Sequence, residues 1–136
     1  MARQYPEALV IGADTVVVVD GEILGKPRDM NQARAFLLLL QNKTHDVFTG
    51  YTLMLGKHAK SRVVRTRVRF KQMTPEEISW YVESGEPMDK AGAYAVQGIA
   101  SLFIDHIQGS YTNVMGLPIS ELYDDLRCFG IRFQGE

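Results

Sequence analysis

The sequence has little cysteine, almost no net charge and no long apolar run. Cys128 is the only cysteine among 136 residues. It can form neither an internal disulfide nor a cysteine-based zinc cluster, so a reducing, cytoplasmic location is expected. Fifteen Lys and Arg residues against sixteen Asp and Glu residues give a formal net charge of -1. This balance provides no general attraction to nucleic acid or to a membrane, so neither is expected as a partner.

The longest strongly apolar runs are residues 15–19 and 35–40, which are much shorter than the ~20 residues of a membrane span. Residues 8–19 are similar to the apolar part of a secretory signal, but Asp14 interrupts them and no cleavage pattern follows. Internal repeats, low-complexity segments and long Pro/Gly/Ser linkers are absent from the sequence. Together with 46% hydrophobic residues, the length predicts one domain that spans residues 1–136.

Hydrophobic periodicity predicts a mixed α/β domain with long antiparallel strand pairs and no regular β-α-β alternation. The predicted strands are residues 8–11, 15–19, 22–24, 47–55, 62–71, 94–96, 102–107 and 131–133. The predicted helices are residues 30–41, 75–84 and 118–129.

Two of these helices have clear start signals. Asp29 is followed by Gln32 three residues later, as in a capping box. Thr74-Pro75-Glu76-Glu77 combines an N-cap, a proline at the first helical position and a glutamate at the third. Gly85 is the expected stop of the second helix.

Asp14 is the most unusual residue of the apolar N-terminal stretch. A carboxylate that interrupts a buried strand has to be paired, bound to a metal, or placed at a strand end that faces a cleft. The alternative is an aspartate that starts a turn between two short strands. From the residues alone, both interpretations remain open.

Two further segments contain residues suited to phosphate chemistry. Lys26 follows Gly25, but Gly21 to Lys26 is one residue short of a Walker A loop, and Pro27 stands where that loop has Ser or Thr. Asp89 and Lys90 begin a small-residue turn that is followed by Gln97-Gly98. An adjacent carboxylate and ammonium suit a metal together with a phosphate, although a salt-bridged surface loop is the simpler interpretation.

Other chemical sites are poorly supported. His45, His58 and His106 lack metal-ligand spacing, and His45 is expected to be structural. The strand at residues 62–71 alternates between an apolar and a basic face, and the basic face could bind RNA. Because stacking aromatic residues are not interleaved with these basic residues, a solvated strand face is the favoured interpretation.

Taken together, the motifs resemble the Maf family, also called septum-formation-inhibitor-like proteins. The resemblance extends over nearly the whole chain from Leu9 onward. It rests on the spaced segments Asp14 to Val17, Gly21 to Pro27, His45 to Gly50, Tyr81 to Pro87, Asp89 to Tyr94, Gln97-Gly98, Gly109 to Tyr111 and Asn113 to Pro118.

This resemblance implies an inosine-triphosphatase-like α/β fold and a nucleoside triphosphate pyrophosphatase. Such an enzyme uses water to split the bond between the α- and β-phosphates, and it needs a divalent cation, Mg²⁺ or Mn²⁺. By motif, Asp14 corresponds to the proton acceptor, and Asp14 and Asp89 to metal ligands. Lys26 and Lys90 are expected to hold the phosphates. Thr15 and Gln97 correspond to the positions that select the base, in the form typical of the dTTP/UTP subgroup, which also suggests modified pyrimidine nucleotides.

The sequence departs from the family's pattern at its N-terminal end. The family opens with a strand and a Ser-x-Ser-Pro-Arg-Arg loop, whereas only Met1 to Ala8 precede the matching segment here. The expectation is therefore an N-terminally truncated Maf fold that lacks one phosphate-binding Arg and one metal-binding carboxylate. A catalytically impaired protein that binds a nucleotide or a partner is the alternative function. An uncovered strand at residues 8–19 predicts self-association, most simply as a homodimer.

Overall fold

The computed structural model describes residues 9–130, which form a five-stranded sheet flanked by helices. The strands are β1 (Leu9–Val19), β2 (Glu22–Leu24), β3 (Thr44–Leu55), β4 (His58–Phe70) and β5 (Ile104–Gln108). Their order in the sheet is β2-β1-β3-β4-β5, and every neighbouring pair is antiparallel. The predicted mixed α/β class with long antiparallel pairs is confirmed. The predicted strand at residues 131–133 lies outside the described residues.

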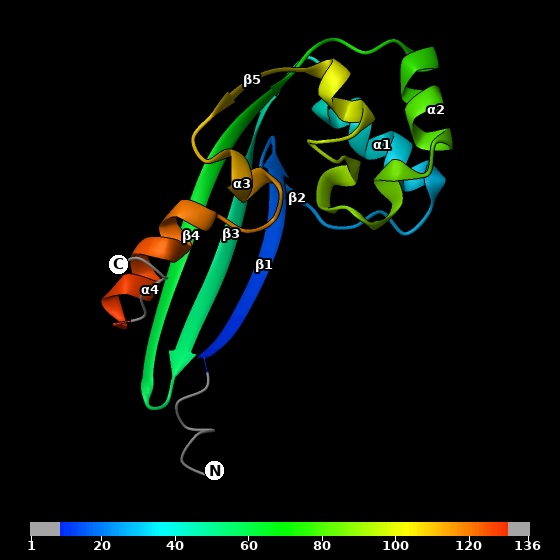
Figure 1. Ribbon diagram of the computed structural model, residues 1–136. Coiled ribbons are helices and arrows are strands. Elements are labelled where there is room, and N and C mark those ends of the chain that lie inside the picture. The colour runs from blue at the N-terminus through cyan, green and yellow to red at the C-terminus, as the bar shows by residue number, and fades with distance from the viewer. Residues whose placement is uncertain (1–8, 131–136) are drawn as a thin grey trace.

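The helices gather in two places (Figure 1). Helices α1 (Met30–Leu40) and α2 (Pro75–Glu83) pack together at one end of the sheet. The short helix α3 (Tyr111–Val114) and α4 (Ile119–Cys128) lie along one face of β3 and β4. None of the helices within residues 9–130 is long and apolar enough to cross a membrane.

Strand β1 corrects the prediction of two short strands at residues 8–11 and 15–19. It is continuous from Leu9 to Val19 because β3 offers it a partner at every position from Leu55 back to Asp46. Gly12, Ala13 and Asp14, which were expected to break the strand, are paired with Thr52, Tyr51 and Gly50. The long ladder of backbone hydrogen bonds overrides the weak strand preference of these three residues.

Strands β3 and β4 are also longer than predicted. The predicted polar turn at residues 56–61 shrinks to Gly56-Lys57, because Leu55 already pairs with His58. Gly56 has a positive φ of 60°, which a two-residue hairpin turn requires. The predicted inward face of β4 is confirmed, since Val64, Thr66, Val68 and Phe70 are all buried.

The helix boundaries agree closely with the predicted ones. The Asp29 side chain accepts a hydrogen bond from the Gln32 backbone N–H at 2.8 Å. Thr74 and Glu77 form the complete capping box, and Gly85 adopts the left-handed conformation after α2. These agreements follow from local chemistry, because a cap depends on residues three or four positions apart.

The segment between α2 and β5 was predicted less well. Residues 94–96, which were predicted as a strand, belong to no strand or helix. They lie between the 3₁₀ helices η3 (Ala91–Ala93) and η4 (Ile99–Phe103), and η2 (Glu86–Asp89) precedes η3. The predicted strand at residues 102–107 begins only at Ile104. Gly92 and Ala93, directly before this segment, have φ values of 74° and 68°, which lie outside the range of a strand.

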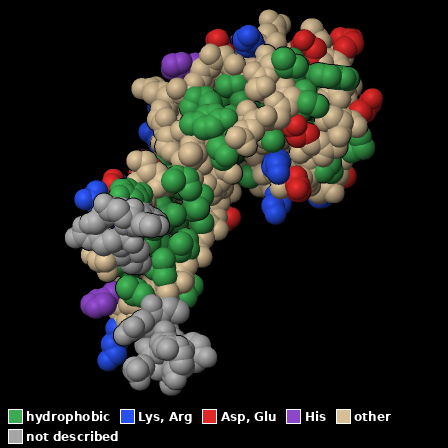
Figure 2. All heavy atoms as spheres, viewed as in Figure 1, with side chains coloured by type: hydrophobic (Ala, Val, Ile, Leu, Met, Phe, Trp, Pro, Cys, Tyr) green, Lys and Arg blue, Asp and Glu red, His purple; other side chains and the backbone are tan. Residues whose placement is uncertain are grey.

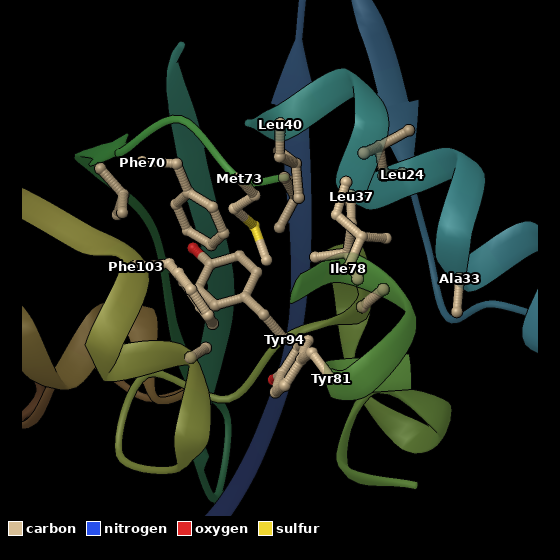
Figure 3. Close-up of a cluster of buried hydrophobic side chains, with 14 of the residues drawn as sticks. Leu24, Ala33, Leu37, Leu40, Phe70, Met73, Ile78, Tyr81, Tyr94 and Phe103 are labelled. Carbon is tan, nitrogen blue, oxygen red and sulfur yellow. The ribbon is translucent and has the colours of Figure 1, made fainter. Parts of the chain in front are cut away.

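Two hydrophobic clusters hold these elements together. The larger lies between α1, α2 and the upper part of the sheet, and Figure 3 shows Leu37, Phe70, Ile78, Tyr81 and Tyr94 converging there. The smaller packs α4 against the lower part of β3 and β4; its buried members are Tyr51, Leu53, Val64, Leu122 and Leu126.

His45 is buried in the larger cluster, with an exposed fraction of 2%. Its Nε2 lies 2.7 Å from the Tyr94 hydroxyl, and its ring packs edge-to-face against Phe70 and Tyr94. Its Nδ1 has no hydrogen-bond partner among the described residues. Burial lowers the pKa of His45 to about 4, although the charge of Asp46 acts in the opposite direction.

This pKa predicts a loss of stability in mild acid. In the unfolded chain His45 binds a proton near pH 6.5, but in the folded chain it does so only near pH 4. The free energy of unfolding should therefore fall by up to about 3 kcal/mol as the pH drops from 6.5 to 4. Urea unfolding at several pH values measures this change. His45→Gln should flatten the curve in this window, and the exposed His58→Gln should not. Identical pH dependence in His45→Gln and the unmodified protein would contradict the assignment.

Candidate active site

A cleft opens where β1 meets the loops at the helical end of the sheet. Its volume is about 220 Å³, smaller than the roughly 300–1,000 Å³ of sites that enclose a whole small molecule. It is lined by Ala13, Asp14, Thr15, Val17, Lys26, Val47, Asp89, Lys90, Ala91, Tyr94, Val114, Met115 and Gly116. Five of the six residues predicted from the sequence are in this set, and they come from three separate segments of the chain.

Asp14 lies within β1, neither at a strand end nor in a turn between two short strands. It pairs with Gly50 of β3, and its other edge is open, because β2 pairs only with Val17 to Val19. The side chain is exposed, and it has no hydrogen bond or ion pair with any residue between 9 and 130. An unpaired carboxylate at the border of a cleft is free to bind a cation or to accept a proton.

The loop that carries Lys26 is tied to the loop that carries Lys90. The backbone N–H of Gly92 donates to the Gly25 carbonyl at 3.0 Å. Gly92 has a φ of 74°, and a Cβ there would lie 2.7 Å from Cγ2 of Val17. Only glycine therefore fits against β1 at this point, and this close approach places both lysines on the same cleft.

Asp89 ends η2, and Lys90 follows it directly. Their side chains form an ion pair of 3.5 Å between Nζ and Oδ1, with exposed fractions of 46% for Lys90 and 78% for Asp89. An ion pair this exposed contributes little to stability. Both side chains can therefore turn toward a charged ligand at small cost.

Thr15 lines the cleft, and its hydroxyl is held from two sides. It lies 2.8 Å from the Thr49 hydroxyl and donates to the Gly116 carbonyl at 3.2 Å. Thr49 is completely buried and also approaches the carbonyl of Asn113 at 3.4 Å.

Asn113 fixes the wall of the cleft opposite the lysines. It is completely buried in α3, and its Nδ2 donates to the carbonyls of Val47 and Val64 at 3.1 and 3.0 Å. The helix that it fastens to the sheet leads directly to Val114, Met115 and Gly116, which line the cleft. Sequence reasoning assigned no role to Thr49 or Asn113. The one signal in the sequence that could have indicated them was a polar residue on the buried side of β3, at Thr49, and of α3, at Asn113.

Gln97 is the one predicted site residue that the structure leaves outside the cleft. It is exposed, and its side chain has no partner among the described residues. The backbone around it is well fixed, because the Glu86 carboxylate accepts hydrogen bonds from the backbone N–H groups of Ile99 and Ala100. A Cβ on Gly98 would overlap this carboxylate.

The charged residues of the cleft suit a phosphate ligand that arrives with a divalent cation. The formal charges of two lysines and two aspartates cancel, so these residues alone do not neutralise a polyphosphate. Residues 9–130 contain no group of three or more His, Cys, Asp or Glu residues placed to enclose a metal. Asp14 and Asp89 instead fit Mg²⁺, which is usually bound by one or two carboxylates together with substrate phosphates.

Comparisons with known proteins show which sequences this chain is similar to. The chain is 51% identical over 139 residues to a dTTP/UTP pyrophosphatase of Syntrophus aciditrophicus, covering all of this chain and 68% of the relative. It is 50% identical over 121 residues to the dTTP/UTP pyrophosphatase of Myxococcus xanthus, covering 89% of this chain and 61% of the relative. The dTTP/UTP pyrophosphatase of Bacillus cytotoxicus is 46% identical over 129 residues, with 95% and 68% covered.

The chain therefore spans about two thirds of the length of these curated relatives. The model of one protein family, described as Maf-like protein, matches residues 1–129. The match includes every segment that lines the cleft. The chain belongs to the Maf-like protein family.

Proposed function

We propose that this chain provides a nucleoside triphosphate pyrophosphatase site that acts on dTTP and UTP in the cytoplasm. The observation that carries the proposal is the convergence of Asp14, Lys26, Asp89 and Lys90 on one cleft. The relatives named dTTP/UTP pyrophosphatase, at 46–51% identity, support the same activity. Modified pyrimidine nucleotides fit the same proposal.

In this proposal, Asp14 accepts a proton from water while the water oxygen forms a bond to the α-phosphorus and displaces the oxygen that bridges to the β-phosphate. The anhydride P–O bond breaks, and the products are the nucleoside monophosphate and pyrophosphate. Lys26 and Lys90 bind phosphate oxygens and stabilise the charge that develops on the leaving pyrophosphate. Asp14 and Asp89 would hold Mg²⁺ or Mn²⁺, and the bound cation would supply further neutralisation of the phosphates.

Thr15 and Gln97 are proposed to select the base. Hydroxyl and amide groups can pair with the polar edge of a pyrimidine. Thr15 is already in the cleft, whereas Gln97 is exposed at the turn before η4. Selection by Gln97 therefore requires that the base extends beyond the cleft, which agrees with a cleft too small to hold a whole nucleotide.

Replacement of Asp14 tests the reaction. Asp14→Asn keeps the shape of the side chain but removes the proton acceptor, so kcat should fall by about 10² to 10⁴-fold. Release of pyrophosphate from UTP with Mg²⁺ or Mn²⁺ measures the effect. Asp105→Asn is the matched control, because Asp105 is exposed on β5 outside the cleft. Full activity in folded Asp14→Asn would refute the role of Asp14. Nucleotide binding without turnover by the unmodified chain would favour the alternative of a binding protein.

A nucleotide panel tests the choice of substrate. UTP and dTTP should exceed GTP and ATP in kcat/KM by at least about tenfold. A site whose polar groups match the edge of a pyrimidine leaves those groups without hydrogen-bond partners when a purine binds. Gln97→Ala should reduce this preference, and Gln72→Ala, at another exposed glutamine, should not. If GTP or ATP is the best substrate, the proposed specificity is wrong.

We also propose that the chain self-associates as a homodimer through β1. Among the described strands, none pairs with the outer edge of β1 from Leu9 to Val16, and Val10 and Ile11 expose 57% and 43% of their surface there. An open apolar edge favours pairing with a second strand. Light scattering should give twice the chain mass. Val10→Lys should shift the protein toward monomer, and Ile23→Lys on β2 should not. A monomer at all concentrations would refute the proposal.

A further inference from the structure

A tyrosine and a glutamate that do not line the cleft lie at the base of one of its loops. Tyr81 is completely buried in α2, and Glu86 is the first residue of η2. The Tyr81 hydroxyl donates to Oε2 of Glu86 at 2.5 Å. Burial raises the pKa of Tyr81, and this hydrogen bond raises it further, so the hydroxyl keeps its hydrogen at neutral pH.

The same two side chains bind backbone groups at the far end of the loop. The Tyr81 hydroxyl accepts a hydrogen bond from the Ala95 N–H at 3.1 Å. Oε1 of Glu86 accepts from the Ile99 N–H at 2.9 Å, and Oε2 accepts from the Ala100 N–H at 3.4 Å. The chain from Glu86 to Ala95 is therefore a loop whose two ends are joined by one pair of side chains.

The loop at residues 86–95 supplies Asp89, Lys90, Ala91 and Tyr94 to the cleft. Its regular structure is limited to the short 3₁₀ helices η2 and η3. Such short helices have weak hydrogen-bond geometry and do little to fix the course of a chain. Joining the two ends of the loop reduces the number of conformations that its middle can adopt.

We propose that Glu86 and Tyr81 are positioning residues that hold this loop in the conformation which places Asp89 and Lys90 at the cleft. The ligand that depends on them is the phosphate chain with its divalent cation. This inference rests on the proposed function, because that function gives Asp89 and Lys90 their ligands. It adds two residues outside the cleft that set the affinity for the substrate.

The position of Glu86 requires a carboxylate, because both of its oxygens accept hydrogen bonds. An amide has one accepting oxygen and one donating nitrogen. In Glu86→Gln, a nitrogen in place of Oε2 would face the hydroxyl hydrogen of Tyr81, and a nitrogen in place of Oε1 would face the N–H of Ile99. Either orientation leaves one hydrogen at the base of the loop without its acceptor.

Two nearly isosteric variants, Glu86→Gln and Tyr81→Phe, test the proposal. With UTP and Mg²⁺, each should raise KM at least about tenfold and leave kcat within about threefold, because substrate binding has to order the loop again. A purely structural role would instead reduce the folded fraction, which lowers the apparent kcat and leaves KM unchanged.

Hydrogen exchange of the ligand-free protein gives a second readout that needs no activity. The Gly92 N–H donates to the Gly25 carbonyl from the middle of the loop. In folded Glu86→Gln and Tyr81→Phe, this amide should exchange at least about tenfold faster than in the unmodified protein, because opening of the loop exposes it.

Thr74→Ala is the matched control. It removes the N-cap of α2, the helix that carries Tyr81, and leaves both ends of the loop unchanged. This variant should unfold at a lower temperature, whereas KM and the exchange of Gly92 in the folded protein should stay within about threefold. If Glu86→Gln does not fold, Tyr81→Phe decides the test, since it removes a single oxygen and keeps the ring.

An unchanged KM or an unchanged exchange rate of Gly92 in the folded variants would overturn the proposal. Equally large changes in Thr74→Ala would overturn it as well, because the effect would then follow stability. Faster exchange in Glu86→Gln and Tyr81→Phe, together with no hydrolysis of UTP by the unmodified chain, would leave the closure of the loop standing and reject the proposed pyrophosphatase activity.

Discussion

The arrangement of the cleft depends on the buried amide of Asn113. Buried amide hydrogens need acceptors, and Nδ2 of Asn113 donates to carbonyls of two adjacent strands, at Val47 and Val64, whereas its Oδ1 has no partner among the described residues. The two carbonyls and the Thr66 hydroxyl together exceed the two hydrogens of Nδ2, so the group is fully used as a donor. These hydrogen bonds fasten α3 to β3 and β4. The loop that follows α3 then forms one fixed wall of the cleft.

The opposite wall depends on close packing. Gly92 lies so near Val17 that no larger residue fits, and its N–H joins the 90–92 segment to the loop of Lys26. The two walls therefore meet β1 through different means, a buried polar contact on one side and a glycine contact on the other. The charged side chains between the two walls, Asp14, Lys26, Asp89 and Lys90, are exposed, and an exposed ion pair such as Asp89–Lys90 contributes little to the stability of the fold. In the surface view, most of the visible acidic and basic side chains lie over the helical end of the molecule, interspersed with hydrophobic ones (Figure 2).

Local signals predicted much of the fold. The caps at Asp29 and Thr74 and the alternation along β4 depend on neighbours in the sequence, and the structure has them where they were expected. The continuity of β1 through Asp14 could not be predicted in the same way, because it depends on β3, which lies more than thirty residues away. The prediction of a strand at residues 94–96 was wrong. Alternating apolar residues are typical of a strand, but Tyr94 and Val96 are buried here without being part of any described strand.

The residues of the candidate site were also predicted only where the signal is local in the sequence. The chemical groups Asp14, Lys26 and Lys90 were found from motifs, since their residue types reflect phosphate chemistry. Thr49 and Asn113 were not, because their importance comes from contacts across 64 and 66 positions of sequence. A polar residue on a buried face gives a weak signal until its partners are known.

A crystal structure of the chain with uridine 5′-(α,β-imido)triphosphate and Mg²⁺ would test most directly that this cleft is the nucleotide site. The account predicts phosphates between Lys26 and Lys90, with the cation on Asp14 and Asp89. Phosphates bound instead to the basic strand face around Arg65 and Arg67, with the cleft empty, would contradict it.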